Sequence, residues 1–238
     1  YDTAKVLERM LDGIMIRTYA HQDVLDLAEY ANIPVINALT DLLHPCQVLA
    51  DLMTTYEHKG KLEGLKLAYI GDGNNMAHSL MYGCAKGSVS AEAPNNTSRG
   101  LAVKAGMDCA IATPENYQCD AEVVANAKDD FKKSGKELIL TTDPVEAIKN
   151  ADVVYTDTWV SMGQEAEKAE RQKIFMPYQV NGELFKNAAD DAVFMHCLPA
   201  YRGFEVTEEV IDGPQSVIFD EAENRLHAQK AVMATLMG

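Results

Sequence analysis

The chain has 238 residues, of which 47% are hydrophobic and 24% charged, a composition typical of a globular protein with enough core for one large or two modest domains. Its formal net charge of −15 argues against nucleic acid or an anionic membrane as a partner, because binding to phosphates needs clustered positive charge. No apolar run approaches the roughly 18 residues that cross a bilayer. The five cysteines are widely spaced and form no CxxC pair, which favours a reduced compartment, and we expect a cytoplasmic protein.

The first 62 residues alternate between helical and strand-like segments. Helical spacing and capping residues predict three helices, over residues 2–11, 23–30 and 42–58. Short apolar runs predict two strands, over residues 14–16 and 34–36. The first strand leaves Arg17 at its end, and Pro45 suits the first turn of the third helix.

A second alternating series begins after the polar, glycine-containing segment 59–64, which is the best candidate for a domain boundary. Apolar runs predict five strands, over residues 67–70, 109–112, 137–140, 153–155 and 193–195. Helical or loop segments separate them, and a last helix is predicted over 223–237. Strands that alternate with helices at this spacing form parallel sheets covered by helices, so we predict an α/β fold.

Residues 87–104 do not fit this alternation. The segment is polar, rich in small residues and much longer than the usual connection of about 2–6 residues between a helix and a strand. We interpret it as an exposed inserted loop. Its Asn-x-Ser/Thr sequences at Asn95 and Asn96 are chance matches in a cytoplasmic protein.

Polar side chains in the first part of the chain stand where ligands bind in parallel sheets. Arg17 follows an apolar strand, and ligands of open α/β sheets bind at the carboxyl ends of the strands. His44 precedes a proline, which holds its backbone extended and lets the ring project across the start of a helix. Gln47, one turn later, offers an amide donor and acceptor on the same side. Taken singly, each is as well explained by an ordinary surface or turn residue.

The turn Gly71–Asn75 follows a strand and looks superficially like a dinucleotide-binding turn. It lacks the third glycine of GxGxxG, so a nucleotide site is not expected. Its paired asparagines, at a helix start, could instead hold a carboxylate through amide and backbone donors. Asp157 follows another strand and precedes Ser161 by four residues, a spacing that could grip an ammonium group.

The strand 193–195 delivers Cys197 and Pro199 at its end, and Arg225 is predicted near the start of the last helix. A thiol, a backbone turn and a guanidinium beside a helix N-terminus suit a small anionic substrate. The six histidines show no HxxH or HExxH pairing, so we expect no catalytic metal, and no organic cofactor is indicated.

Five motifs together resemble the ornithine carbamoyltransferase family, in that family's order and approximate spacing. They are His-Pro-x-Gln, Gly-Asp-Gly-Asn-Asn, Asp-Thr-Trp-Val-Ser-Met-Gly, His-Cys-Leu-Pro and Glu-Ala-Glu-Asn-Arg. The resemblance covers nearly the whole chain except 87–104. It implies transfer of the carbamoyl group of carbamoyl phosphate to the side-chain amine of ornithine, two α/β domains with the first one incomplete, and a homotrimer.

The resemblance also implies roles for individual residues. Carbamoyl phosphate would be bound by Arg17, His44, Gln47, Cys197, Leu198 and Arg225. Ornithine would be bound by Asn75, Asp157, Ser161, Met162 and Cys197. The residues implied in catalysis are Arg17, His44, Cys197 and Arg225. Residues 1–62 would be the remainder of the carbamoyl-phosphate domain, 63–222 the ornithine domain, and 223–238 a helix that packs back on the first domain.

The Ser-Met-Gly triplet sets the chain apart from aspartate-specific relatives, which lack it and carry His-Pro-Leu-Pro in place of His-Cys-Leu-Pro. Putrescine-specific relatives share the last two motifs but have a different loop at Ser-Met-Gly, so putrescine is the alternative acceptor. The family's phosphate-binding Ser-Thr-Arg-Thr loop would lie upstream of Tyr1, and without it we expect slow transfer. A chain that binds ornithine without catalysing transfer is the alternative outside the enzymes.

Overall fold

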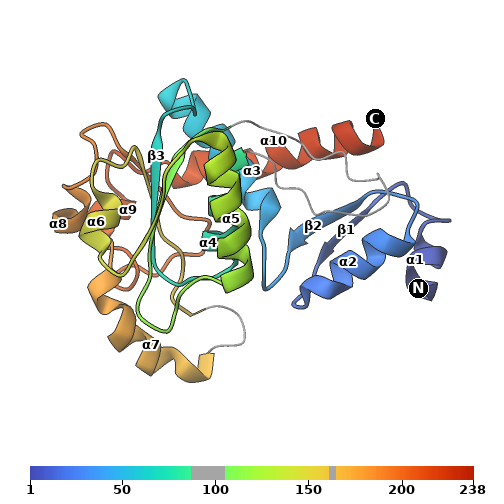
Figure 1. Cartoon of the computed structure of the whole chain (residues 1–238), viewed down its shortest axis with the longest axis horizontal. Coiled ribbons are helices and arrows are strands. Elements are labelled where there is room, and N and C mark those ends of the chain that lie inside the picture. The colour runs from blue at the N-terminus through green and yellow to red at the C-terminus, as the bar shows by residue number, and fades with distance from the viewer. Residues whose placement is uncertain (87–104, 161–164) are drawn as a thin grey trace.

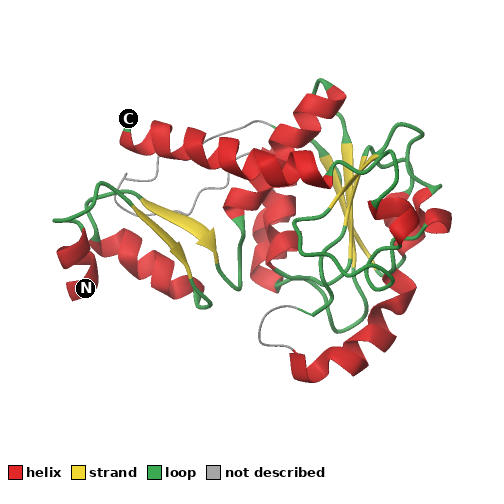
Figure 2. Cartoon of the chain, turned by 180° about the vertical axis from the view of Figure 1, so that it is seen from behind, coloured by secondary structure: helices red, strands yellow, loops and turns green. Residues whose placement is uncertain are grey.

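The computed structural model describes residues 1–86, 105–160 and 165–238, and its strands form two separate parallel sheets (Figures 1 and 2). The smaller sheet pairs β1 (Ile14–Arg17) with β2 (Val35–Leu39). The larger one has the order β5-β4-β3-β6-β7. Its strands are β3 (Lys66–Ile70), β4 (Asp108–Ala112), β5 (Leu138–Thr141), β6 (Val153–Tyr155) and β7 (Val193–Met195). The predicted α/β fold with parallel sheets is therefore confirmed.

Helices connect these strands. Before β3 they are α1 (Asp2–Leu7), α2 (His21–Tyr30) and α3 (Pro45–Lys59). Those of the larger sheet are α4 (Asn75–Lys86), α5 (Ala121–Ser134), α6 (Pro144–Ile148), α7 (Lys168–Phe175), α8 (Gly182–Phe185), α9 (Glu208–Ile211) and α10 (Ile218–Met237), with 3-10 turns η1 (Glu165–Glu167) and η2 (Met176–Tyr178). No described helix is apolar enough over its length to cross a membrane.

The larger sheet is buried on both faces, which explains why its strands read as continuous apolar runs. Alternate residues of one strand, such as Leu67 and Tyr69, pack in a cluster with α3, α4 and α5. Their neighbours Ala68 and Ile70 pack on the opposite face with α6, α8 and α9. The carboxyl ends of all five strands meet at one edge, and the segments that follow them carry most of the motifs.

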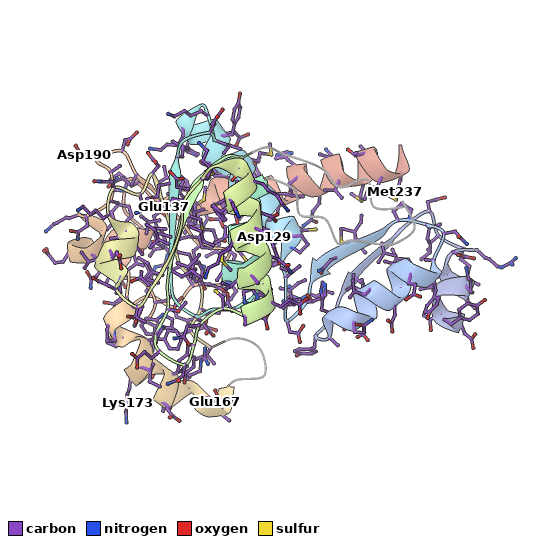
Figure 3. All side chains as sticks on the ribbon, in the orientation of Figure 1. Asp129, Glu137, Glu167, Lys173, Asp190 and Met237 are labelled. Atoms are coloured by element: carbon purple, nitrogen blue, oxygen red, sulfur yellow. The ribbon has the colours of Figure 1, made fainter. Side chains whose placement is uncertain are left out.

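Helix α10 packs along α3 and contacts residues of both sheets, β7 of the larger one and β2 of the smaller one (Figures 1 and 2). Asn224 donates from its amide to Thr54 Oγ1 of α3 at 2.9 Å and to Glu57 at 2.7 Å. Farther along, Val232 packs with Ile36 of β2. Met237, at the far end of the helix in Figure 3, lies near the β1 end of the smaller sheet.

The helix begins five residues earlier than the sequence predicts, at Ile218 instead of Glu223. The acidic residues Asp220 and Glu221 in the first turn suit a helix N-terminus, but no side chain caps the helix at Val217 to mark where it begins. Arg225 therefore lies two turns inside the helix, and the expectation that it stands beside a helix N-terminus is wrong.

The turn after β3 depends on a glycine that allows close backbone contact. A Cβ on Gly73 would lie 2.4 Å from the backbone nitrogen of Cys119 and 2.6 Å from the carbonyl oxygen of Tyr117. We expect Gly73→Ala to lower the free energy of unfolding by roughly 1–3 kcal/mol, because a backbone clash cannot be relieved by rotating a side chain. Urea unfolding measures this. Gly13→Ala is the matched control, since its one close Cβ contact is with the flexible end of Met237, and the backbone oxygen of Pro34 lies at an ordinary 3.5 Å. Equal costs for the two variants would contradict the argument.

Candidate active site

Asp157 and Cys197 come together at the carboxyl ends of the adjacent strands β6 and β7. The Cys197 thiol donates to Asp157 Oδ1 at 3.2 Å, and Asp157 Oδ2 accepts from the Asn74 amide at 2.9 Å. The backbone N–H of Thr158 also donates to Asp157, at 2.7 Å. Burial first, and then the charge of Asp157, raise the pKa of the Cys197 thiol well above its usual range. This end of the site therefore presents a buried carboxylate beside a neutral thiol.

The two asparagines of the Gly71–Asn75 turn have different partners. Asn74, the first of the paired asparagines that the sequence marks as able to hold a carboxylate, donates to Asp157 and also caps α4 by accepting from the N–H groups of Met76 and Ala77. The Asn75 amide donates to the carbonyl of Thr40 at 2.7 Å, in the loop after β2. Asn75, at the start of α4, is thus hydrogen-bonded to the loop that follows β2 of the smaller sheet. It forms no hydrogen bond with Asp157.

A buried ion pair holds the segment that follows Asp157. Arg171 of α7 pairs with Asp72 in the turn after β3, and its Nε donates to the carbonyl of Trp159 at 2.5 Å. The guanidinium lies over the rings of both Tyr117 and Phe175, at 4.9 and 5.0 Å from their centroids, and the two rings contact each other edge to face. Lys173 of this stretch points outward (Figure 3), and the largely exposed Glu167 lies 3.8 Å from the Arg171 guanidinium. The predicted ligands Ser161 and Met162 lie outside the described residues.

Arg225 is held by two glutamine side chains. Its Nη1 donates to Gln47 Oε1 of α3 at 2.6 Å. With its amide oxygen turned toward the guanidinium, Gln229, one turn later on α10, accepts from Nη2 at 2.8 Å and Nε at 3.1 Å. No described carboxylate forms an ion pair with Arg225. Amide oxygens orient the guanidinium without neutralising it, so its charge remains available to an anion.

His44 lies beside this arginine and is buried, with 5% of its surface exposed. Burial lowers the pKa of His44 to about 3, helped by the charges of Arg225 and Arg17. Because the charges of both arginines act on the His44 ring, Arg17, His44 and Arg225 lie close to one another. His44 is therefore a neutral ring at ordinary pH, and its Nδ1 has no hydrogen-bond partner among the described residues.

The neutrality of His44 predicts an acid-dependent loss of stability. Between pH 6.5 and about 3 the unfolded chain binds a proton at His44 that the folded chain does not, so the free energy of unfolding falls as the pH drops through this window, by up to about 1.4 kcal/mol per pH unit. His44→Gln, which cannot titrate, should show a slope shallower by one proton. Urea unfolding at a series of pH values measures both slopes, and identical slopes would contradict a neutral buried ring.

His196 connects the β7 turn to the core. Its Nδ1 accepts from the N–H of Leu198 at 2.9 Å, so its Nε2 carries the hydrogen and faces Glu205 at 3.3 Å. Leu198 adopts a φ of 56°, a left-handed conformation that an L residue adopts only under constraint. His196, Cys197 and Asp157 offer potential metal-ligand atoms within 4.8 Å of one another, but both ring nitrogens and the thiol are already in protein hydrogen bonds.

The structure therefore gathers the predicted residues into two groups. Arg17, His44, Gln47 and Arg225 form one group, and Asp157, Cys197 and Leu198 the other. Sequence reasoning missed the residues that support them. These are Asp72, Arg171, Gln229, Asp51 and Glu221. Asp72 stands in a motif that the sequence did show, and Arg171 and Glu221 have partners far away along the chain. Asp51 and Gln229 lie one helical turn from Gln47 and Arg225, but the sequence alone does not show which residues of these helices face the site.

Comparison with known proteins identifies the family. The model of the aspartate/ornithine carbamoyltransferase carbamoyl-P binding domain matches residues 1–57, and that of the Asp/Orn binding domain matches residues 93–236. The ornithine carbamoyltransferase of Carboxydothermus hydrogenoformans is 58% identical over the whole chain, which spans 70% of that enzyme. The one from Thermococcus kodakarensis is 56% identical with the same coverage.

Solved structures agree with these matches. The ornithine carbamoyltransferase from Pyrococcus furiosus superimposes with a TM-score of 0.89 at 54% identity, covering all of this chain and 70% of that one. The enzyme from Gloeobacter violaceus gives 0.86 at 50% identity, covering all of this chain and 74% of that one. The chain therefore belongs to the aspartate/ornithine carbamoyltransferase family, a family of enzymes, among its ornithine carbamoyltransferases.

Proposed function

We propose that this chain carries the site that transfers the carbamoyl group of carbamoyl phosphate to the side-chain amine of L-ornithine, giving L-citrulline and phosphate. The observation that best supports the proposal is the un-neutralised guanidinium of Arg225 in the same neighbourhood as neutral His44 and the carboxylate–thiol pair of Asp157 and Cys197. One group suits an oxyanion, and the other suits an ammonium-bearing amino acid.

The residues divide the chemistry between them. The neutral amine of ornithine attacks the carbonyl carbon, a C–N bond forms, the C–O bond to phosphate breaks, and the amine proton leaves with the phosphate. Arg17 and His44 stabilise the negative charge that develops on the carbonyl oxygen, a contribution worth about 3–4 kcal/mol per donor in a water-excluded site. Gln47 Oε1 accepts an N–H of the carbamoyl group, and Arg225 neutralises the departing phosphate.

Ornithine would lie against the β6 and β7 turns. Asp157 attracts an ammonium group of the amino acid, and Cys197 with Leu198 lies between the two substrates. Asn75, Ser161 and Met162 would complete the amino-acid end by family resemblance. The Asn75 amide donates to the carbonyl of Thr40, so this role requires it to exchange partners.

The two sheets and the two matched segments support a division into domains. We propose that residues 1–62 belong to the carbamoyl-phosphate domain, 63–222 to the ornithine domain, and 223–238 to a helix that packs back on the first domain. We also propose a homotrimer, a cytoplasmic location and a place in arginine biosynthesis. One relative, from Pyrococcus furiosus, is named an anabolic ornithine carbamoyltransferase. Sedimentation tests the trimer.

An assay for the carbamoylated product, citrulline from ornithine or N-carbamoylputrescine from putrescine, tests the reaction. Ornithine-dependent citrulline formation supports the proposal, and activity with putrescine alone would replace it with the putrescine reaction. Calorimetry separates a catalytic chain from a binding module. If the chain binds ornithine but not carbamoyl phosphate and forms no citrulline, it is a binding module. The rate of citrulline formation also tests the expectation, drawn from the sequence, that transfer is slow.

A further inference from the structure

Two acidic side chains lie at the centre of the site and have no role in the reaction as written. Asp51 of α3 is 1% exposed and Glu221 of α10 is 0% exposed. Both accept a hydrogen bond from the same group, the side-chain amide nitrogen of Gln47, at 2.8 and 3.0 Å. Two buried carboxylates this close repel each other strongly, so the pair needs a physical explanation.

Glu221 has the surroundings of an ionised carboxylate. Its Oε1 accepts from the hydroxyl of Tyr155 on β6 at 3.0 Å, and its Oε2 accepts from the backbone N–H of His196 after β7 at 2.8 Å. With the amide of Gln47, all three neighbours are donors. Donors on both oxygens stabilise the charged form, although burial still raises the pKa of Glu221.

Asp51 has the surroundings of a protonated acid. Its Oδ1 accepts from Gln47, but its buried Oδ2 receives no hydrogen bond from any described residue. The residue faces Glu221, so a proton on Asp51 supplies a donor to that carboxylate and leaves neither oxygen unsatisfied. Burial and the charge of Glu221 raise the pKa of Asp51 well above its usual range, and the hydrogen bond from Gln47 and the charge of Arg225 oppose this only in part.

The pair determines which way the Gln47 amide faces. Both acids use its NH₂ group, so its oxygen must point the other way, toward Arg225. A flipped amide would place its oxygen against two acid oxygens and its NH₂ against a guanidinium. Either acid in a different protonation state would weaken this preference.

We propose that Asp51 and Glu221 share one proton and act as positioning residues, which fix the Gln47 amide with its oxygen toward Arg225 and toward the N–H groups of a carbamoyl substrate. The effect on the reaction rests on the proposed carbamoyl transfer. The shared proton and the orientation of Gln47 do not, so they can be tested even in an inactive protein.

Infrared spectroscopy tests the proton directly. At neutral pH the difference spectrum between wild type and Asp51→Asn should contain the C=O stretch of a buried protonated carboxyl group. A difference spectrum with only ionised-carboxylate bands would overturn the proposal, whatever the activity of the protein.

The side-chain NH₂ signal of Gln47 in NMR spectra, assigned by its loss in Gln47→Leu, tests the orientation. Its protection from solvent exchange should be lost in Asp51→Leu and Glu221→Gln but restored in Asp51→Asn, which keeps an acceptor for Gln47 and a donor to Glu221. Thr55→Val is the matched control on α3. It removes a buried hydroxyl whose partners are the Asp51 carbonyl and the Met195 sulfur, and should lower stability while leaving this signal protected. Loss of protection in Asp51→Asn to the same extent as in Asp51→Leu would overturn the proposal.

Kinetics then connect the pair to the reaction. The value of kcat/KM for carbamoyl phosphate should fall about 10- to 100-fold in Asp51→Leu and Glu221→Gln, the effect of one lost hydrogen bond to a charged group, and recover in Asp51→Asn. No recovery would refute the positioning role. Wild type that shows the infrared band and the protected amide but no transferase activity would refute the proposed function and leave the shared proton standing.

Discussion

Arg225→Gln should lower kcat/KM for carbamoyl phosphate by about 10²- to 10³-fold, because it removes a charge-assisted donor that no described carboxylate neutralises. Glutamine can still bond Gln47 or Gln229, so the fold should keep most of its stability. The loss should appear in steady-state rates at low carbamoyl phosphate and in calorimetric titration with carbamoyl phosphate alone.

Arg202→Gln provides the matched control. Arg202 forms a bidentate pair with Asp212, at 2.8 and 2.6 Å, and its side chain is 40% exposed. Its loss should leave kcat/KM within about twofold, since exposed ion pairs contribute little. If Arg225→Gln behaved like this control, the anion would have to bind elsewhere and the proposed division of the site would fail.

Asp157→Asn should lower kcat/KM for ornithine by a similar factor, about 10²- to 10³-fold. The carboxylate accepts from the Asn74 amide, the Thr158 N–H and the Cys197 thiol. An asparagine NH₂ would face at least one of these donors, and the negative charge that attracts an ammonium group would be lost. Ornithine-dependent rates and calorimetry with ornithine measure the effect.

Two variants separate the charge from the packing. Cys197→Ser keeps a donor to Asp157 and should lose much less ornithine affinity than Asp157→Asn. Asp143→Asn changes an aspartate that caps α6, accepting from Val145 N at 2.9 Å, and should affect stability only slightly. Equal ornithine affinity in wild type and Asp157→Asn would contradict the proposal that Asp157 binds an ammonium group of ornithine.

The sequence predicted the fold and the strand ends well because both depend on local patterns. Apolar runs marked every strand of the larger sheet, and parallel pairing then placed Asp157 and Cys197 at the same edge. The start of α10 was misplaced because its first turn has no capping side chain, which left only a weak boundary signal.

Several supporting contacts could not be predicted, because they join residues far apart in the chain. Gln47 and Glu221 meet only when α3 and α10 pack together, and Arg171 reaches Asp72 across 99 positions. Nothing in the order of two adjacent asparagines tells which one faces Asp157. The residue types show that such side chains can form hydrogen bonds, but tertiary packing decides with which partners.

The guanidinium of Arg225 is hydrogen-bonded to the uncharged amides of Gln47 and Gln229, and this affects experiments in solution. A guanidinium held by amides attracts any compact oxyanion, so inorganic phosphate, which the proposed reaction itself releases, competes with the reactant for the same place. Rates recorded in phosphate or sulfate buffers would therefore understate what the protein achieves, and accumulating product would slow its own formation.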